Sequence, residues 1–157
     1  MSQEVVFDCM VFLQAASRPW RVHGLFEAAK TGRLKLYVSP EILAEVRDVL
    51  LRPKIRQRFP ALTSGIVDAF LAEVLSFATL VSKAPPTFSF ARDPKDEKYL
   101  NLAIAIGARY VASADSDLLD LMDASTAEGQ TFRSRFPTIK IIKPGELMRI
   151  LEQEQSL

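Results

Sequence analysis

The sequence is poor in the residues that mark several common kinds of site. Its 157 residues include one cysteine, Cys9, and one histidine, His23. A single cysteine forms no disulfide within the chain, and the HExxH and Cys/His zinc patterns are absent. A catalytic pair of histidines within one chain is excluded for the same reason. We interpret Cys9 as a small buried residue of the first strand region and His23 as a surface or structural residue.

Phosphate-binding loops and membrane signals are missing as well. Neither GxxxxGK[ST] nor GxGxxG occurs, which argues against nucleotide hydrolases and dinucleotide enzymes. No apolar run reaches the ~18 residues that a membrane span needs. The N-terminal Met-Ser-Gln-Glu lacks the basic and apolar regions of a signal peptide. We therefore expect a cytoplasmic protein with no membrane contact.

The overall composition is that of one folded domain. Hydrophobic residues make up 48% of the chain and charged residues 25%, a normal globular balance. We expect residues 1–157 to form a single domain, since this length suffices for one core. The net charge is +1, so any binding of nucleic acid must depend on local basic patches.

Apolar patterning predicts strands that alternate with helices. The expected strands are 4–8, 34–38, 109–113 and 139–142, with a further short strand beginning at 80–81. The expected helices are 22–31, 40–51, 63–78, 93–107, 116–122 and one that follows Pro144-Gly145. Residues 18–21 are placed in the loop after the first strand, and 123–137 is expected to be the longest loop. This alternation predicts a three-layer α/β/α sandwich with a central, mostly parallel sheet.

Acidic residues stand where such a fold places its ligand site. Asp8 ends the run Val5-Val6-Phe7, and Asp115 follows the run Tyr110-Val111-Ala112. Ligands of open α/β sheets bind beyond the carboxyl ends of the strands. Glu45 and Asp96 fall on the apolar stripes of two expected helices, where a charge is costly without a partner. Two strand ends and two inward-facing helical acids indicate a divalent cation and phosphate chemistry.

Each carboxylate also has a purely structural interpretation. Asp8 is suited to capping the turn after its strand, and Glu45 to reaching water along its stem. Asp96 is suited to the positive end of the helix dipole, while Asp93 is interpreted mainly as the cap of that helix. Asp115 or Asp117 is suited to capping a helix near Ser116. A cluster of carboxylates without His or Cys nevertheless matches the oxygen ligands that Mg²⁺ and Mn²⁺ prefer.

At this point the chain resembles the PIN-domain ribonucleases, and most closely the PIN-family toxins of bacterial toxin–antitoxin pairs. The resemblance covers nearly the whole chain and rests on VVFD, SPEILAEVRDVLLRPK, DPKDEKYLNLAIAIGARYVASADSDLL and KPGELMRIL. It implies a Mg²⁺- or Mn²⁺-dependent endoribonuclease with an RNA substrate, a cognate antitoxin and a homodimeric state. The resemblance implies the following roles: Asp8, Glu45, Asp96 and Asp115 as catalytic metal ligands, Asp117 as a further ligand, and Ser113 and Asp93 as supporting groups.

One departure from the family pattern keeps a second hypothesis open. The family follows its first Asp with a small hydroxyl residue and Asn, where this chain has Cys9-Met10. Loss of a hydrogen-bonding group beside a metal ligand weakens metal binding ~10–100-fold. The alternative function is a catalytically weak PIN fold that acts as an RNA-binding or protein-interaction module.

A local basic segment provides candidate contacts to RNA phosphates. It follows the helix that carries Glu45 and contains Arg52, Lys54, Arg56 and Arg58. Arg21 lies near the expected rim of the site, beside Trp20. An unpaired base stacks well on such an indole ring, although packing in the core or in a dimer is the favoured interpretation of Trp20.

Overall fold

A parallel β-sheet forms the centre of the fold. The computed structural model describes residues 3–156, in which five strands pair in the order β3-β2-β1-β4-β5, all parallel. The central strand β1 is buried on both faces, which explains its continuous apolar run. The strands are β1 (Gln3–Phe7), β2 (Leu34–Val38), β3 (Thr79–Leu80), β4 (Tyr110–Ala112) and β5 (Lys140–Ile142).

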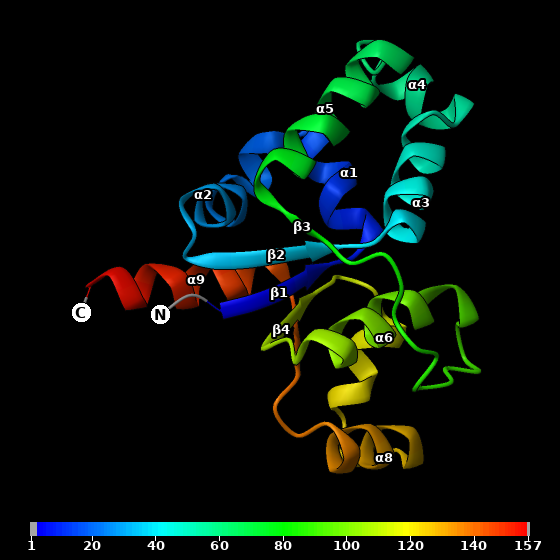
Figure 1. The fold of residues 1–157 in the computed structure, drawn as a ribbon, viewed down its shortest axis with the longest axis vertical. Helices are drawn as coiled ribbons and strands as arrows, with labels where there is room; N and C mark the ends of the chain where they lie inside the picture. Colours follow the sequence, from blue (N-terminus) through cyan, green and yellow to red (C-terminus); the bar gives the residue numbers. More distant parts are fainter. Residues whose placement is uncertain (1–2, 157) are drawn as a thin grey trace.

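Helices cover both faces of the sheet. In Figure 1, α1, α2 and α3 lie above the sheet, whereas α6 and α8 lie below it. The C-terminal helix α9 packs beside α2. The predicted three-layer α/β/α sandwich is therefore confirmed. The helices are α1 (Cys9–Ser17), η1 (Pro19–Arg21), α2 (His23–Thr31), α3 (Pro40–Leu50), α4 (Pro53–Arg58), α5 (Ser64–Phe77), η2 (Pro94–Asp96), α6 (Glu97–Ile106), α7 (Ser116–Leu119), η3 (Asp120–Met122), α8 (Ala127–Arg135) and α9 (Pro144–Ser156).

The strand order contains a switch point between β1 and β4. The chain leaves β1 towards β2 and β3 on one side, then returns to place β4 and β5 on the other side. Ligands of open α/β sheets bind at such a point, beyond the carboxyl ends of the strands. Asp8 directly follows β1, and Ser113 directly follows β4, so both lie at this position.

Local signals fix the helices that carry the candidate site. Helix α3 begins after Ser39, whose hydroxyl accepts a hydrogen bond from the Ile42 amide at 3.2 Å, and Pro40 occupies its first position. Helix α6 ends at Gly107, whose φ of 65° is a left-handed conformation that glycine adopts readily. None of the helices within residues 3–156 is long and apolar enough to span a membrane.

The prediction of a loop after the first strand was wrong. Helix α1 starts at once because Asp8 accepts a hydrogen bond from the Val11 amide at 3.1 Å, and Val11 and Phe12 are buried. The following residues 19–21 form the short helix η1. The basic segment also contains a helix, α4, which the sequence pattern did not reveal.

The predicted long loop at 123–137 contains helix α8, so that prediction was also wrong. Thr126 caps the helix by accepting a hydrogen bond from the Gly129 amide at 3.0 Å. Phe132 and Phe136 pack against Phe88, which lies far away in the sequence. The helix has few apolar residues of its own, and therefore this distant contact, rather than its periodicity, stabilises it.

Gly129 is required by the turn that precedes α8, and its replacement by Ala should destabilise the protein. A Cβ at this position would lie 2.0 Å from the backbone oxygen of Asp123. We expect Gly129→Ala to lower the free energy of unfolding by ~1–3 kcal/mol, because backbone must move to relieve the overlap. Chemical denaturation measures the change. The control is Gly145→Ala, where a Cβ meets nothing within 4 Å; equal stability of the two variants would contradict the prediction.

Candidate functional site

Asp8 is buried at the carboxyl end of β1. Its side chain is held on both oxygens: the Val11 amide donates to Oδ1 at 3.1 Å, and the Ser113 hydroxyl donates to Oδ2 at 2.5 Å. Burial raises the pKa of Asp8 to about 6, although these hydrogen bonds oppose the rise and the nearby charge of Asp115 adds to it. Asp8 therefore keeps its proton to a higher pH than an exposed aspartate does.

Ser113 connects the ends of the two central strands. It is fully buried after β4, and its Oγ both donates to Asp8 and accepts from the Asp115 amide at 2.9 Å. Asp115 in turn caps α7 by accepting from the Asp117 amide at 2.9 Å. One hydroxyl thus fixes the relative position of two carboxylates from different strands.

Three carboxylates come together beside this link. Oxygen atoms of Asp93, Asp96 and Asp115 all lie within 4.8 Å of one another. Asp93 caps the short helix η2 by accepting from the Lys95 amide at 3.2 Å, and Asp96 ends that helix. Burial, together with the neighbouring carboxyl groups of Asp115 and Asp93, raises the pKa of Asp96 to about 8.

The chemistry of these three side chains fits a hard divalent cation. Oδ2 of Asp96 is buried and has no hydrogen-bond partner among residues 3–156. A buried carboxylate oxygen without a donor, next to two further carboxylates, is costly unless a cation is bound or a proton is taken up. All the donor atoms are oxygens, which suits Mg²⁺ or Mn²⁺.

Glu45 has partners from the protein itself. On α3, its Oε2 lies 2.7 Å from Nζ of Lys98, and the Tyr99 hydroxyl donates to its Oε1. Burial and this hydrogen bond raise the pKa of Tyr99. Glu45 therefore lies outside the group of three carboxylates, with its charge balanced by Lys98 from the start of α6.

Cys9 is half-buried beside Glu45. Burial and the negative charges of Glu45 and Asp8 raise the pKa of its thiol to about 12. Burial and these charges therefore favour the protonated thiol over the thiolate. Its role in the described structure is to pack against the hydrophobic core.

Asp117 is turned towards an arginine. Nε of Arg92 lies 2.8 Å from its Oδ1, and Nη2 of the same arginine lies 2.8 Å from Oδ2 of Asp120. In this conformation Asp117 belongs to an ion-pair network at the edge of the site. The amide of Asp117 nevertheless helps to orient Asp115, as described above.

A second feature is a group of arginines at the end of α1 and in α4. The guanidinium carbons of Arg18 and Arg58 lie 5.2 and 5.6 Å from the ring centre of Phe59. Partial loss of water and the like charges of Arg58 and Arg21 lower the pKa of Arg18. Within residues 3–156, none of these three arginines forms an ion pair with an acid.

The other basic and aromatic candidates are arranged differently. Arg52 is paired with Asp48 at 3.1 Å, whereas Lys54 and Arg56 are exposed on α4. Trp20 is 72% exposed, so its predicted packing in the core of this chain is wrong. An exposed indole next to the arginines is compatible with stacking or with a contact to another molecule.

Comparison with known families places these residues in context. A family model described as PIN domain matches residues 4–117, a segment that contains Asp8, Glu45 and the three-carboxylate group. The chain belongs to the PIN domain family. A search of curated proteins gave no match.

The fold of this PIN domain is similar to that of a chain in a solved protein–DNA structure. The similar chain comes from the crystal structure of VapBC2 from Rickettsia felis bound to a DNA fragment from their promoter. The two chains share 16% sequence identity, with a TM-score of 0.52, and the alignment covers 88% of this chain and 96% of the other. At this identity the comparison supports the fold.

Several features of this PIN domain were not foreseen from the sequence. Asp93, expected to be a cap and a supporting group, caps η2 and also contributes an oxygen to the three-carboxylate group itself. The only available signal was its spacing in Asp93-Pro94-Lys95-Asp96. Glu45 pairs with Lys98, and Asp117 pairs with Arg92. No sequence pattern indicated these two ion pairs, because each joins segments that are distant in sequence.

Proposed function

We propose that this PIN domain is a divalent-metal-dependent endoribonuclease that hydrolyses RNA phosphodiester bonds. The observation that carries the proposal is the group formed by Asp93, Asp96 and Asp115, in which one buried oxygen of Asp96 lacks a donor. PIN domains are generally nucleases, so the family match supports the same conclusion.

The residues divide into ligands and groups that position them. Asp96 and Asp115 would hold a Mg²⁺ or Mn²⁺ ion, with Asp93 and Asp8 completing the acidic site. When bound, such an ion lowers the pKa of water and offsets negative charge on the phosphodiester. Ser113 fixes Asp8 and Asp115 relative to each other.

Hydrolysis then adds water to phosphorus and breaks the bond to the 3′-oxygen. The products are a 5′-phosphate and a 3′-hydroxyl end. Asp8, with its pKa of about 6, is suited to accept a proton released near the strand ends. In this proposal Glu45 would be a further ligand if Lys98 released it, and Asp117 acts through its amide on Asp115.

The arginine group favours a substrate with exposed phosphates, which suits a nucleic acid. Arg18, Arg21 and Arg58 present positive charge that no acid of the described residues offsets, and phosphate groups would reduce their mutual repulsion. The exposed Trp20 offers a surface on which an unpaired base stacks. Lys54, Arg56 and, after release from Asp48, Arg52 extend this surface.

The proposed biological role is that of a toxin in a type II toxin–antitoxin pair. The support is the similarity of fold to the VapBC2 structure, which is bound to a DNA fragment from their promoter. The proposal includes a cognate antitoxin, a homodimeric state and a cytoplasmic location. Co-expression with the product of an adjacent short gene tests the partnership by co-purification.

The decisive experiment is cleavage of a mixed pool of single-stranded and structured RNA. We expect fragments with Mn²⁺ or Mg²⁺ and none with EDTA, and 5′-phosphate ends should make the fragments substrates for a 5′-phosphate-dependent exonuclease. Cleavage that persists in EDTA would contradict the metal-dependent mechanism, and 5′-hydroxyl ends would contradict the direction of bond breakage.

A second function is favoured by two specific observations. Cys9-Met10 replaces the hydroxyl–Asn pair of the family, and Lys98 already neutralises Glu45. Both observations point to a weak metal site and to a PIN fold that binds RNA or protein without efficient cleavage. RNA binding that is unchanged by EDTA, without cleavage of any RNA in the pool, would establish this function in place of the first.

A further inference from the structure

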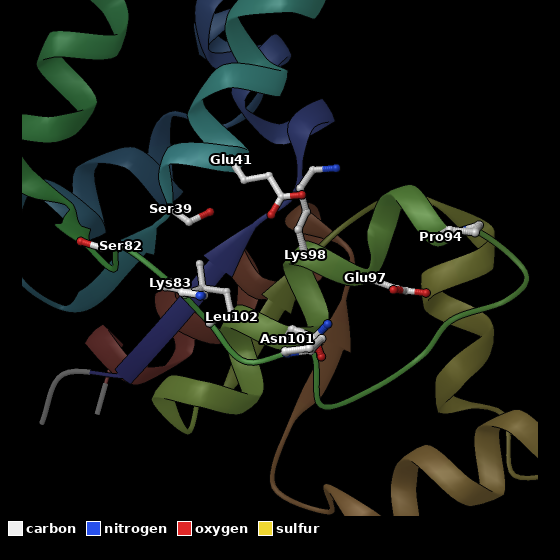
Figure 2. Close-up of a pocket in the computed structure, with 11 residues that line it drawn as sticks. Ser39, Glu41, Ser82, Lys83, Pro94, Glu97, Lys98, Asn101 and Leu102 are labelled. Carbon is white, nitrogen blue, oxygen red and sulfur yellow. The ribbon is translucent and has the colours of Figure 1, made fainter.

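A cavity of about 350 Å³ lies next to the carboxylates, on the other side of Lys98. It is enclosed by the start of α3, the loop that follows β3, and the first turns of α6. Figure 2 shows Ser39, Ser82 and Lys83 on one side, Pro94 and Glu97 on the other, and Lys98 and Asn101 between them. We call it the α3–α6 cavity. Its volume is at the small end of the range for ligand sites, ~300–1,000 Å³.

Asn101 presents an unpartnered donor to this cavity. The side chain is only 7% exposed, and its Oδ1 accepts a hydrogen bond from the Phe88 amide at 2.8 Å. Because Oδ1 is held by Phe88, Nδ2 is the end of the amide that faces away from Phe88. Nδ2 has no hydrogen-bond partner among residues 3–156, although the residue lines the cavity. A nearly buried amide that leaves its donor unused is suited to an incoming acceptor.

The rest of the lining mixes donors and acceptors. Lys83 and Glu41 are exposed and form no ion pair with any residue of 3–156. Ser39 accepts from the Ile42 amide, which leaves its own proton free to donate. Glu97 accepts from the Phe90 amide through Oε2.

The lining offers no excess of positive charge, because Lys83 is the only other lysine beside Glu41 and Glu97 once Lys98 is paired with Glu45. Such a site suits an uncharged ligand with polar edges better than it suits a phosphate. Apolar walls come from Pro86, Pro94 and Leu102, which are suited to the flat faces of a ring. A nucleobase combines these properties, since its edge carries donors and acceptors and its faces are apolar.

The position of the cavity connects it to the proposed chemistry. Lys98 lines the cavity and contacts Glu45, while Pro94 and Glu97 lie on either side of Lys95-Asp96 in η2 and α6. An RNA strand that crosses the carboxylates can therefore place its next nucleotide in the cavity. Sequence-specific proteins commonly recognise RNA through such unpaired bases.

We propose that the α3–α6 cavity receives one unpaired nucleobase of the RNA, next to the bond that is cut, and that Asn101, Lys83 and Glu41 select its identity. This inference rests on the proposed ribonuclease function for its biological meaning. The binding of a base is nevertheless a separate physical property and is measurable without cleavage.

The sharpest test is Asn101→Asp, because the carboxylate still accepts from the Phe88 amide while the donor towards the cavity becomes an acceptor. We expect the preference for one base over the others, at one position beside the cut, to change by about tenfold. Sequencing the fragments of a randomised RNA measures how often each base occurs at that position. Lys83→Gln, at an exposed position, should weaken the same preference. Gln153→Glu on α9 and Lys35→Gln on β2 are matched controls for charge.

A second readout separates this inference from the nuclease proposal. Four short oligonucleotides, each containing only one kind of base, are titrated with the protein in EDTA. Fluorescence anisotropy gives their affinities. Base-selective binding that Asn101→Asp alters supports the cavity, even if no RNA is ever cleaved. Equal affinities for all four oligonucleotides in the wild type, or a preference that neither variant at the cavity changes, would overturn the inference while leaving metal-dependent cleavage untouched.

Discussion

Replacement of Asp96 by Asn is expected to reduce metal-dependent RNA cleavage at least ~100-fold, because losses of groups around a metal ligand already cost ~10–100-fold. The side chain supplies the oxygen that lacks a donor and lies between the carboxylates of Asp93 and Asp115. Above pH ~8, where Asp96 of the metal-free protein is deprotonated, the same change should raise the melting temperature, since an amide removes one of three crowded negative charges and donates to its neighbours.

The measurement combines initial rates in Mn²⁺, calorimetric titration with Mn²⁺, and thermal melting in EDTA. Asp68→Asn is the matched control, since Asp68 is an exposed residue of α5 that pairs with Arg47 at 2.9 Å. The control should keep full cleavage and metal binding. An Asp96→Asn protein that cleaves RNA at the wild-type rate would show that the three-carboxylate group is not the catalytic site.

The stability of the metal-free protein is expected to fall as the pH rises from about 4 to about 9. Asp96 has a folded pKa of about 8 and Asp8 of about 6, both above the usual value of 3.8. A raised carboxyl pKa means that the folded state holds protons which the unfolded state releases. The resulting stabilisation is complete below pH ~4 and is lost as the pH passes through the folded values.

Divalent cations should reverse this loss, because they bind the deprotonated carboxylates of the folded state. At a free Mn²⁺ concentration 100 times the Kd, binding adds about 2.7 kcal/mol to the stability. Melting curves from pH 5 to pH 9, with Mn²⁺ and with EDTA, measure both effects. The rise in melting temperature should be largest at high pH and small in Asp96→Asn. A metal-free stability that is constant across this range would contradict the electrostatic description of the site.

Patterns within single segments were enough to predict the architecture. The apolar run ending at Asp8, the alternation in 34–38 and the cap at Ser39 depend on neighbouring residues, and the parallel sheet follows from the order of such segments. The position of Asp8 and Asp115 at the same edge of the sheet follows from this order, because parallel strands end at the same edge, whereas the pairing of β1 with β4 was shown only by the structure.

Other elements depend on contacts that no local pattern encodes. Helix α8 has few apolar residues, and it forms because Phe132 and Phe136 meet Phe88 from a distant segment. Helix α1 was overlooked because the sequence suggested a strand followed by a loop, whereas Asp8 ends the strand and starts the helix in one step.

The sequence by itself therefore determined the parallel sheet, the order of helices and strands along the chain, and the presence of acidic residues at the carboxyl ends of the strands. The tertiary structure decided which acids meet. It brought Asp93 into contact range of Asp96 and Asp115, paired Glu45 with Lys98, and left the amide of Asn101 facing a cavity. The reason is physical: backbone hydrogen bonds and apolar periodicity act over a few residues, whereas the partner of a charge is chosen by the packing of segments far apart in the chain.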